Sequence, residues 1–509
     1  MPDTDATSTS PEAKPADKTA EKRQAEQVAK RLATSPATSA GSVSLADGRR
    51  LNYHTACEFI PVMPTGLGAD SGDPEAAVFT TAYLLNGLDR GSRPVCFAFN
   101  GGPGSSSVWL HLGALGPKRV VVPDDASMPS PPYEVSDNPV TWLAHFDLVF
   151  IDPPHTGWSI AAGDAARTKL FSVDGDVAAL TEVMRGWLTR HKRWRSKVYL
   201  AGESYGTTRG AALAESLQNA NVALAGLILV SCAMDLQSIV FAPRNDLPCA
   251  LFLPAFAGVA QYHGKLQGAL AESPMAARNA AEAFVADDYL RALAAGARLS
   301  GSQRRHLAQR IAELTGLSTA FVEEKNLRIS DQDFFFELLR DRGRIVGRLE
   351  ARSTGPMAAS RRREWEFDPG IEAIAAPYGM AALAYFGEQL GLVREERYQL
   401  LSMDVNKGWN WNRGEAKGNG FASTSDDLSR ALRRNPHLRV LVASGRYDLG
   451  TPYSASDWSL AQLDVPSDVM ARVEHHYYDA GHMMYTREAD LVKMERDLAR
   501  WLASPLPTG

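Results

Sequence analysis

The sequence has few cysteines and no long apolar run. Its four cysteines, Cys57, Cys96, Cys232 and Cys249, are scattered, and none belongs to a C-x-x-C pair. This spacing excludes a disulfide scaffold and argues against a zinc or redox centre. The sequence contains no run of about 20 apolar residues, the length that a membrane-spanning helix needs. It also lacks, near Met1, the apolar segment of about 7 to 15 residues that a secretory signal contains. We therefore expect a cytoplasmic location and no membrane partner, with export as the alternative.

Strong charge imbalance is also missing. The formal net charge is -5, with 45% hydrophobic and 22% charged residues, as in an ordinary globular protein with a sizeable core. This balance gives no reason to expect a nucleic-acid partner. Two basic stretches, Arg340–Arg348 and Arg361–Arg363, are expected to be solvated helix faces without a function, and contact with an acidic substrate is the alternative.

Large apolar side chains are nearly absent from residues 1–40, which are rich in Ala, Thr, Ser, Pro, Lys and Glu. Such a segment buries too little apolar surface to offset the entropy of ordering it. We predict a disordered N-terminal arm over residues 1–40.

After the arm, short apolar stretches alternate with amphipathic ones. Val177–His191 has apolar residues at helical spacing, behind Ser172 and Asp174 as possible caps. Near-continuous apolar strands between amphipathic helices predict an α/β fold with a mostly parallel sheet and helices on both faces. The predicted strands are Val78–Tyr83, Val95–Phe99, Leu148–Ile151, Val198–Ala201, Leu227–Val230, Leu438–Ala443 and Val473–Tyr478. A closing helix is predicted from Arg487 to Leu502.

Between residues 241 and 427 the residue pattern changes: Ala-rich and Arg-rich helical stretches dominate, and strand patterns are few. We interpret this region as a mostly helical cap inserted between two parts of one core, residues 41–240 and residues 428–509. Loops at the edge of a sheet accept such insertions because they lie outside the hydrogen-bonded strands.

The clearest local signal is Gly202-Glu-Ser-Tyr-Gly206, which directly follows an apolar strand and precedes a small-residue helix. This context is typical of the nucleophile elbow of the α/β-hydrolase fold, where a strained turn presents a serine hydroxyl. A plain glycine-rich turn is the alternative. We predict an α/β-hydrolase fold with Ser204 as the nucleophile.

In that fold an orienting carboxylate and a general-base histidine follow the serine, in that order. Asp448 lies in the loop after the sixth predicted strand, and His482 lies in the loop after the seventh. Both loops open at the carboxyl edge of the sheet, so we predict a triad of Ser204, Asp448 and His482. The alternatives are Asp457 or Asp479 for the acid and His475 or His476 for the base.

The segment Phe99-Asn-Gly-Gly-Pro-Gly-Ser-Ser-Ser107 follows another predicted strand. Its glycines free the backbone to turn N–H groups toward the oxyanion that forms during acyl transfer. The phosphate-binding patterns G-x-x-x-x-G-K-[ST] and G-x-G-x-x-G are absent, which leaves a tight turn as the alternative.

Together these residues resemble the serine carboxypeptidase family. The matching blocks occur in the family's order between Phe97 and Met483. They are Asn100-Gly-Gly-Pro-Gly-Ser-Ser-Ser107, Gly116-Pro117, Ile151-Asp-Pro-Pro-His-Thr-Gly-Trp-Ser159, Gly202-Glu-Ser-Tyr-Gly206, Gly445-Arg-Tyr-Asp448 and Gly481-His-Met483.

The resemblance implies a serine-type carboxypeptidase that releases C-terminal amino acids from peptides through an acyl-enzyme, without a metal or organic cofactor. In the family, a carboxyl beside the bound substrate carboxylate must be protonated to donate a hydrogen bond. The proximity of the two like charges raises the pKa of this carboxyl and favours activity at acidic pH. The implied roles are Ser204 as nucleophile, His482 as base and then acid, Asp448 as the group that orients His482, the backbone N–H groups of Gly102 and Tyr205 as the oxyanion hole, and Asn100 and Glu203 as the substrate-carboxylate site.

Three positions depart from the family's pattern. Ala114 stands where a second glutamate is usual, Ala98 where a tryptophan is usual, and Ser105 where a half-cystine is usual. The 34-residue spacing from Asp448 to His482 also resembles a trimmed, bacterial-type branch. The alternatives are an esterase or acyltransferase that uses the same triad, or a catalytically inactive peptide-binding homologue. The side-chain preference and the oligomeric state are left open by the sequence.

Overall fold

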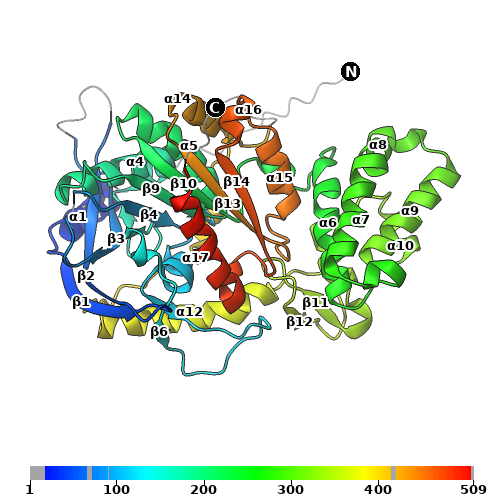
Figure 1. Cartoon of the computed structure of the whole chain (residues 1–509), viewed down its shortest axis with the longest axis horizontal. Helices are drawn as coiled ribbons and strands as arrows, with labels where there is room; N and C mark the ends of the chain where they lie inside the picture. Colours follow the sequence, from blue (N-terminus) through cyan, green and yellow to red (C-terminus); the bar gives the residue numbers. More distant parts are fainter. Residues whose placement is uncertain (1–17, 66–71, 90, 414–419, 506–509) are drawn as a thin grey trace, which may run out of the picture.

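A central mixed sheet organises the protein. The computed structural model describes residues 18–65, 72–89, 91–413 and 420–505, and Figure 1 shows its elements. The strand order is β1-β2-β3-β7-β4-β9-β10-β13-β14, with β8 paired to β3. Neighbours from β7 to β14 are parallel, whereas β1, β2 and β3 pair antiparallel and β3 meets β7 antiparallel. The predicted α/β-hydrolase architecture is confirmed.

The predicted strands match observed ones closely. The predictions for β4 and β14 have the observed bounds, and the other five overlap their strands with small differences at the ends. Strands β1, β2 and β8 of this sheet were not predicted. In β1, small and polar residues carry only a weak alternating pattern. The strands of the sheet are β1 Ala37–Ser44, β2 Arg50–Val62, β3 Ala76–Leu85, β4 Val95–Phe99, β7 Asp147–Ile151, β8 Ile160–Ala161, β9 Val198–Glu203, β10 Leu224–Val230, β13 Arg439–Gly445 and β14 Val473–Tyr478.

Hydrophobic clusters lie on both faces of the sheet. In β4, Cys96 and Ala98 belong to one cluster, and Val95, Phe97 and Phe99 belong to the other. This alternation follows from the two-residue period of a strand. The first cluster includes residues of α12 Pro369–Glu388 and α17 Glu488–Ala503, and the second includes residues of α4 Val173–Arg190, α5 Tyr205–Asn219 and α14 Ser425–Arg434. Both faces are therefore covered by helices, as predicted.

Residues 18–40 correct the prediction of a disordered arm. Lys18–Leu32 forms helix α1, and β1 begins soon after it. Val28 is buried in the core at 2% exposure, and Leu32, four residues later on the same face, packs against the same cluster. Composition hid this helix because it exposes most of its surface and docks through few apolar side chains. Residues 1–17 of the predicted arm lie outside the described residues.

A helical lobe stands beside the sheet, on the right of Figure 1. Its hydrophobic cluster is distinct from the two on the sheet, and Phe256 and Phe334 stack in it with ring centroids 4.1 Å apart. The lobe contains α6 Leu247–Tyr262, α7 Pro274–Phe284, α8 Leu290–Ala295, α9 Gly301–Thr315, α10 Thr319–Glu324 and α11 Asp331–Glu337. By contrast α12, in the same predicted insertion, packs on the core through residues such as Tyr378 and Tyr385.

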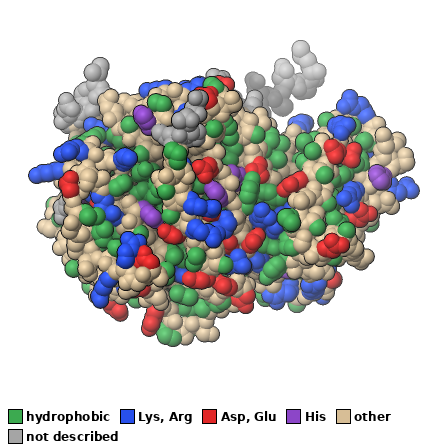
Figure 2. All heavy atoms as spheres, in the orientation of Figure 1, with side chains coloured by type: hydrophobic (Ala, Val, Ile, Leu, Met, Phe, Trp, Pro, Cys, Tyr) green, Lys and Arg blue, Asp and Glu red, His purple; other side chains and the backbone are tan. Residues whose placement is uncertain are grey.

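Charges of both signs are mixed over the surface that Figure 2 shows, on the core and the lobe alike. The prediction that Arg340–Arg348 is a solvated helix face is wrong. Gly343, at φ 65°, ends a short 3-10 turn, and the chain then forms the hairpin of β11 Arg344–Val346 and β12 Thr354–Pro356. The four cysteines are buried free thiols. Within the described ranges, no helix has both the length and the apolarity that crossing a bilayer requires.

The docking of α1 can be tested at Val28. We expect Val28→Ala to lower the free energy of unfolding by about 1–3 kcal/mol, because buried methyl groups are lost and a cavity remains. Gln27→Ala, on the exposed side of the same helix, is the control and should change stability by less than about 0.5 kcal/mol. Urea denaturation measures both, and equal effects would show that α1 is not docked.

Candidate active site

Ser204 stands at a sharp turn between β9 and α5. Its backbone has φ 61° and ψ −130°, a conformation that a residue with a side chain rarely adopts. Its N–H donates a 2.9 Å hydrogen bond to the carbonyl of Val230, which fixes the turn to β10. Glu203 and Tyr205 on either side are buried, whereas Ser204 is half-buried. The turn therefore holds one hydroxyl within reach of a substrate.

The glycine-rich segment passes directly against this turn. A Cβ on Gly101 would collide with the backbone nitrogens of Tyr205 and Gly206, so only glycine permits the approach. Gly102 has φ 99° and is exposed. Gly102, Ser204 and Tyr205 line one pocket with a volume of 420 Å³. The predicted oxyanion-hole residues thus share a pocket with the predicted nucleophile.

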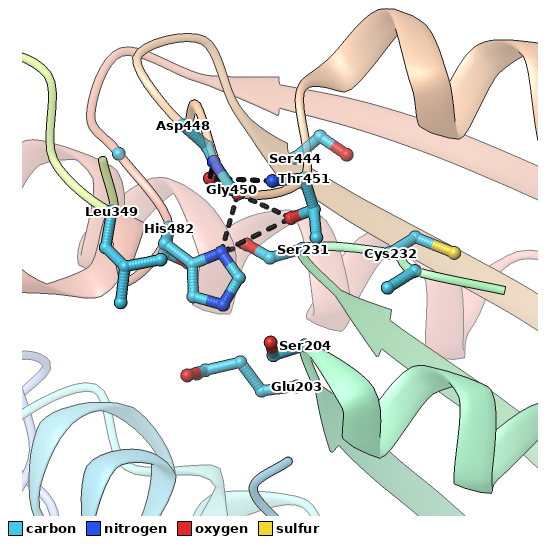
Figure 3. Close-up of polar contacts among 12 residues, drawn as sticks. Glu203, Ser204, Ser231, Cys232, Leu349, Ser444, Asp448, Gly450, Thr451 and His482 are labelled. Carbon is cyan, nitrogen blue, oxygen red and sulfur yellow. Dashed lines mark hydrogen bonds and ion pairs between the residues drawn. The ribbon is translucent and has the colours of Figure 1, made fainter. Parts of the chain in front are cut away.

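His482 and Asp448 meet in two neighbouring loops (Figure 3). Their Nδ1 and Oδ2 atoms are 2.7 Å apart. The carboxylate also accepts hydrogen bonds from the N–H of Gly450 at 2.7 Å, and from the N–H and the hydroxyl of Thr451 at 3.0 and 2.6 Å. The exposed fractions of His482 and Asp448 are 4% and 0%, so this contact is sheltered from water.

Burial and charge act in opposite directions on this pair. Burial alone would raise the pKa of Asp448 and lower that of His482. The imidazole and the hydrogen bonds to the carboxylate outweigh burial, and the pKa of Asp448 lies below its ordinary value. The carboxylate in turn raises the pKa of His482 above its ordinary value. His482 is thereby made a better proton acceptor, as a general base requires.

Ser204 lies on the side of the His482 ring away from Asp448 (Figure 3). Because Nδ1 faces the carboxylate, Nε2 is the ring nitrogen that remains for the serine. Among the described residues no hydrogen bond joins Ser204 to the ring. The structure thus gathers the three predicted side chains, with the acid–base contact formed and the serine contact open, as is common before a substrate binds.

Two of the alternative residues, His475 and Asp457, form a group separate from the contact of His482 with Asp448. His475 lies 2.9 Å from Asp457 through Nδ1 and 2.9 Å from Ser444 through Nε2. Ser444 is fully buried, so a substrate cannot reach its hydroxyl. The other two alternatives are Asp479, which is exposed, and His476, which contacts Glu474. In the part of the chain that is described, no group of three or more His, Cys, Asp or Glu side chains is arranged to hold a metal ion.

Asn100 and Glu203, the predicted carboxylate-binding residues, contact each other. The amide of Asn100 donates to Glu203 Oε1 at 2.9 Å, and the hydroxyl of Tyr485 donates to Oε2 at 2.6 Å. The exposed fractions of Asn100 and Glu203 are 1% and 3%. Burial raises the pKa of Glu203 to about 7. Below that pH its carboxyl is neutral and can donate a hydrogen bond.

A buried ion pair, absent from the sequence predictions, holds the glycine-rich segment in place. Arg209 donates through Nε to Asp176 at 2.7 Å and through Nη1 to the carbonyl of Asn100 at 2.6 Å. The hydroxyl of Tyr205 donates to the same Asp176 oxygen at 3.0 Å. The four-residue spacing of Tyr205 and Arg209 was the available signal, because it places both on one helix face.

Residues 348–351, called the strap below, cross between the acid loop and the histidine loop. The carbonyl of Arg348 accepts a hydrogen bond from the N–H of Leu449 at 2.9 Å, and the carbonyl of Leu349 accepts one from the N–H of His482 at 2.7 Å. At the other end of the strap, the N–H of Ala351 donates to the carbonyl of Tyr447 at 3.0 Å. A Cβ on Gly481 would collide with the backbone of the strap. This element was not predicted, because backbone contacts leave no motif in the sequence.

Comparisons with known proteins agree with this geometry. Residues 83–240 match the sequence model of the family described as serine carboxypeptidase. The pheromone-processing carboxypeptidase KEX1 of Yarrowia lipolytica is 33% identical over 140 residues, which cover 27% of this chain and 21% of that protein. KEX1 of Cryptococcus gattii is 31% identical over 151 residues, which cover 29% and 21%. The aligned stretch spans about a fifth of these relatives.

A solved structure is similar in fold over most of the chain, beyond the residues that the sequence comparisons align. The crystal structure of KEX1(delta)p, a prohormone-processing carboxypeptidase from Saccharomyces cerevisiae, aligns with a TM-score of 0.54 and 16% identity, covering 88% of this chain and 91% of that chain. The sheet order and the loops that carry the site define an α/β-hydrolase. Residues 83–240, which contain both the glycine-rich segment and Ser204, are the part of the chain that is similar to the serine carboxypeptidase family.

The raised pKa of Glu203 predicts a pH-dependent stability. The folded-state pKa of about 7 exceeds the ordinary 4.5, so the contribution of Glu203 is complete below pH 4.5 and is lost as the pH rises to 7. We expect wild type to lose up to about 3 kcal/mol relative to Glu203→Gln over this range. Urea denaturation at several pH values measures the difference, and a difference that stays constant with pH would contradict the assignment.

Proposed function

We propose that the protein is a serine-type carboxypeptidase that releases C-terminal amino acids from peptides through an acyl-enzyme on Ser204. The observation that carries this proposal is the buried contact of Asp448 with His482, with Ser204 on the opposite side of the imidazole. The family match over residues 83–240 supports the peptide substrate.

In the proposed reaction, Ser204 Oγ attacks the carbonyl carbon of the last peptide bond while its proton passes to His482 Nε2. The negative oxygen accepts hydrogen bonds from the N–H groups of Gly102 and Tyr205. The C–N bond then breaks, and the amino acid leaves with the proton from His482. Water, deprotonated by His482, attacks the ester, releases the shortened peptide and restores the serine. Asp448 stabilises the imidazolium in both halves.

The pocket also supports a preference for apolar side chains next to the scissile bond. Five of its residues form an apolar wall: Leu236, Ile239, Val240, Trp411 and Phe421. Burying an apolar side chain against such a wall is favourable by about 25 cal/mol per Å² removed from water, before the costs of binding.

We also propose that Asn100 and Glu203 contribute to binding the terminal carboxylate. The position of Glu203 next to the nucleophile and its neutral carboxyl at acidic pH support this role. The resembled family's second carboxyl is absent at Ala114, and a tyrosine hydroxyl, from Tyr485, contacts Glu203 in this protein. Asn100 and Glu203 are buried and bonded to each other, and neither is among the residues that line the 420 Å³ pocket.

The finer assignments remain predictions of the sequence. They are a bacterial-type branch, a cytoplasmic location, and action on peptides without a nucleic-acid or membrane partner; the curated relatives described above are fungal. The incomplete carboxyl pair at Ala114 keeps ester hydrolysis or acyl transfer as the second candidate function. Matched peptide and ester substrates would separate these activities.

Cleavage from the C-terminus is the direct test of the proposal. Wild type incubated with a peptide mixture between about pH 4 and 8 should remove residues stepwise from the C-terminus, followed by mass spectrometry. Ser204→Ala should lower kcat by about 10⁶-fold. Internal cleavage, or equal activity of both proteins, would contradict the proposal. A fluorophosphonate that labels wild type but not Ser204→Ala would separately exclude an inactive homologue.

The acid of the triad can be tested against a matched residue. We expect Asp448→Asn to lower kcat by about 10⁴-fold, because the buried imidazole loses its orienting carboxylate. Asp457→Asn, which changes the equivalent contact in the group around His475, should leave kcat within about threefold of wild type. Steady-state kinetics on one blocked dipeptide measure both, and the reverse ranking would assign the acid to Asp457.

A further inference from the structure

Arg348, the first residue of the strap, places a positive charge in the catalytic pocket. It lines the same 420 Å³ pocket as Gly102 and Ser204. The guanidinium carbon lies 3.4 Å from where a Cβ on Gly450 would stand, directly beside the acid loop. The basic stretch Arg340–Arg348, for which no function was predicted, thus contributes a residue to the site.

The backbone of Arg348 is held firmly while its side chain is exposed. Its carbonyl accepts from the N–H of Leu449 at 2.9 Å, and its N–H donates to Asp368 Oδ1 at 3.0 Å. Among the described residues, the guanidinium has no hydrogen-bond or ion-pair partner. Other arginines nearby do have partners: Arg344 bonds Thr354, and Arg352 bonds Glu350. Arg348 is therefore a positioned cation that lines the pocket without a hydrogen-bonded counter-ion, although its charge also acts on the carboxylates of Asp331 and Asp368.

The charge of Arg348 also reaches the acid–base pair. Its guanidinium opposes the rise in the pKa of His482 that Asp448 causes. A bound anion near Arg348 would offset this repulsion. A planar guanidinium matches the two oxygens of a carboxylate better than any other side chain does.

We propose that Arg348 is a carboxylate-binding residue of this pocket. Its ligand is either the free α-carboxylate of the substrate or an acidic side chain next to the scissile bond. The inference deepens the proposed peptidase function and depends on it for the identity of the substrate. Arg348 acts as a counter-ion for the bound substrate and takes no part in the proton transfers.

Direct binding tests this role without requiring activity. Ser204→Ala protein, with and without Arg348→Gln, is titrated by calorimetry with two pairs of blocked dipeptides. The first pair is Phe-Leu as the free acid and as the C-terminal amide. The second pair is Glu-Leu amide and Gln-Leu amide. Each pair differs by one carboxylate while the rest of the ligand stays constant.

We expect Arg348→Gln to weaken binding of a carboxylate ligand about ten- to hundredfold and to leave its neutral partner within about threefold. A selective loss for the Phe-Leu acid identifies the α-carboxylate, and a selective loss for Glu-Leu amide identifies the side chain. Arg348→Lys should retain part of the preference, because it keeps the charge but loses the planar fork. Arg342→Gln, an exposed arginine outside the pocket, is the charge-matched control and should preserve it.

Equal weakening of charged and neutral ligands, or no preference for either carboxylate when Arg348 is present, would overturn the inference. Failure of the peptidase proposal would be seen separately, as wild type that does not shorten peptides. Thermal melting of each variant identifies misfolding, and Arg348→Lys then provides the comparison if Arg348→Gln is unstable.

Discussion

The site depends on one sheltered contact, the 2.7 Å hydrogen bond between His482 and Asp448. A carboxylate placed in a dry environment is unfavourable unless its lone pairs are satisfied. Here two backbone N–H groups and the Thr451 hydroxyl satisfy them together with the imidazole. The remaining architecture, from parallel strands to strap, brings these groups into one place and keeps water from them.

The sheet accomplishes most of this placement. Because β13 and β14 are parallel neighbours, the loops that follow them leave the same edge and need only a few residues to meet. The turn at Ser204 follows β9, two strands away in the same sheet. The glycine-rich segment follows β4, beside β9, and the ion pair of Arg209 with Asp176 fixes its position against α5. Each group is placed by a rigid element, while the chemistry lies in the turns.

The strands and the turns with local sequence signals could be predicted from the sequence. The strand prediction for β4 was right because a buried parallel strand is a continuous apolar run bounded by turn residues. The prediction for β14 did not rest on such a run, because this edge strand is mostly half-buried and contains Glu474, His475 and His476. The residues around Ser204 could be placed because a strand, a G-x-S-x-G turn and a helix are all local signals. The choice of Asp448 over Asp457 rested on position after a strand, and the structure places Asp448, not Asp457, beside His482.

The failures have physical causes too. Helix α1 was missed because its order depends on docking to the sheet, which composition does not record. Arg348 was interpreted as part of a solvated helix face because charge was counted along the chain, whereas its position depends on backbone hydrogen bonds to residues a hundred positions later. Asp176 and Arg209 lie on different helices and carry no shared motif.

The strap has a consequence for the order in which the site is assembled. Ser204 and its glycine-rich neighbour lie early in the chain, whereas the base comes late and is bonded to a segment that follows the helical lobe. Ser204 therefore lies beside its proposed proton acceptor only after the strap and the last two strands are in place, so the site is completed by parts of the chain far apart in sequence.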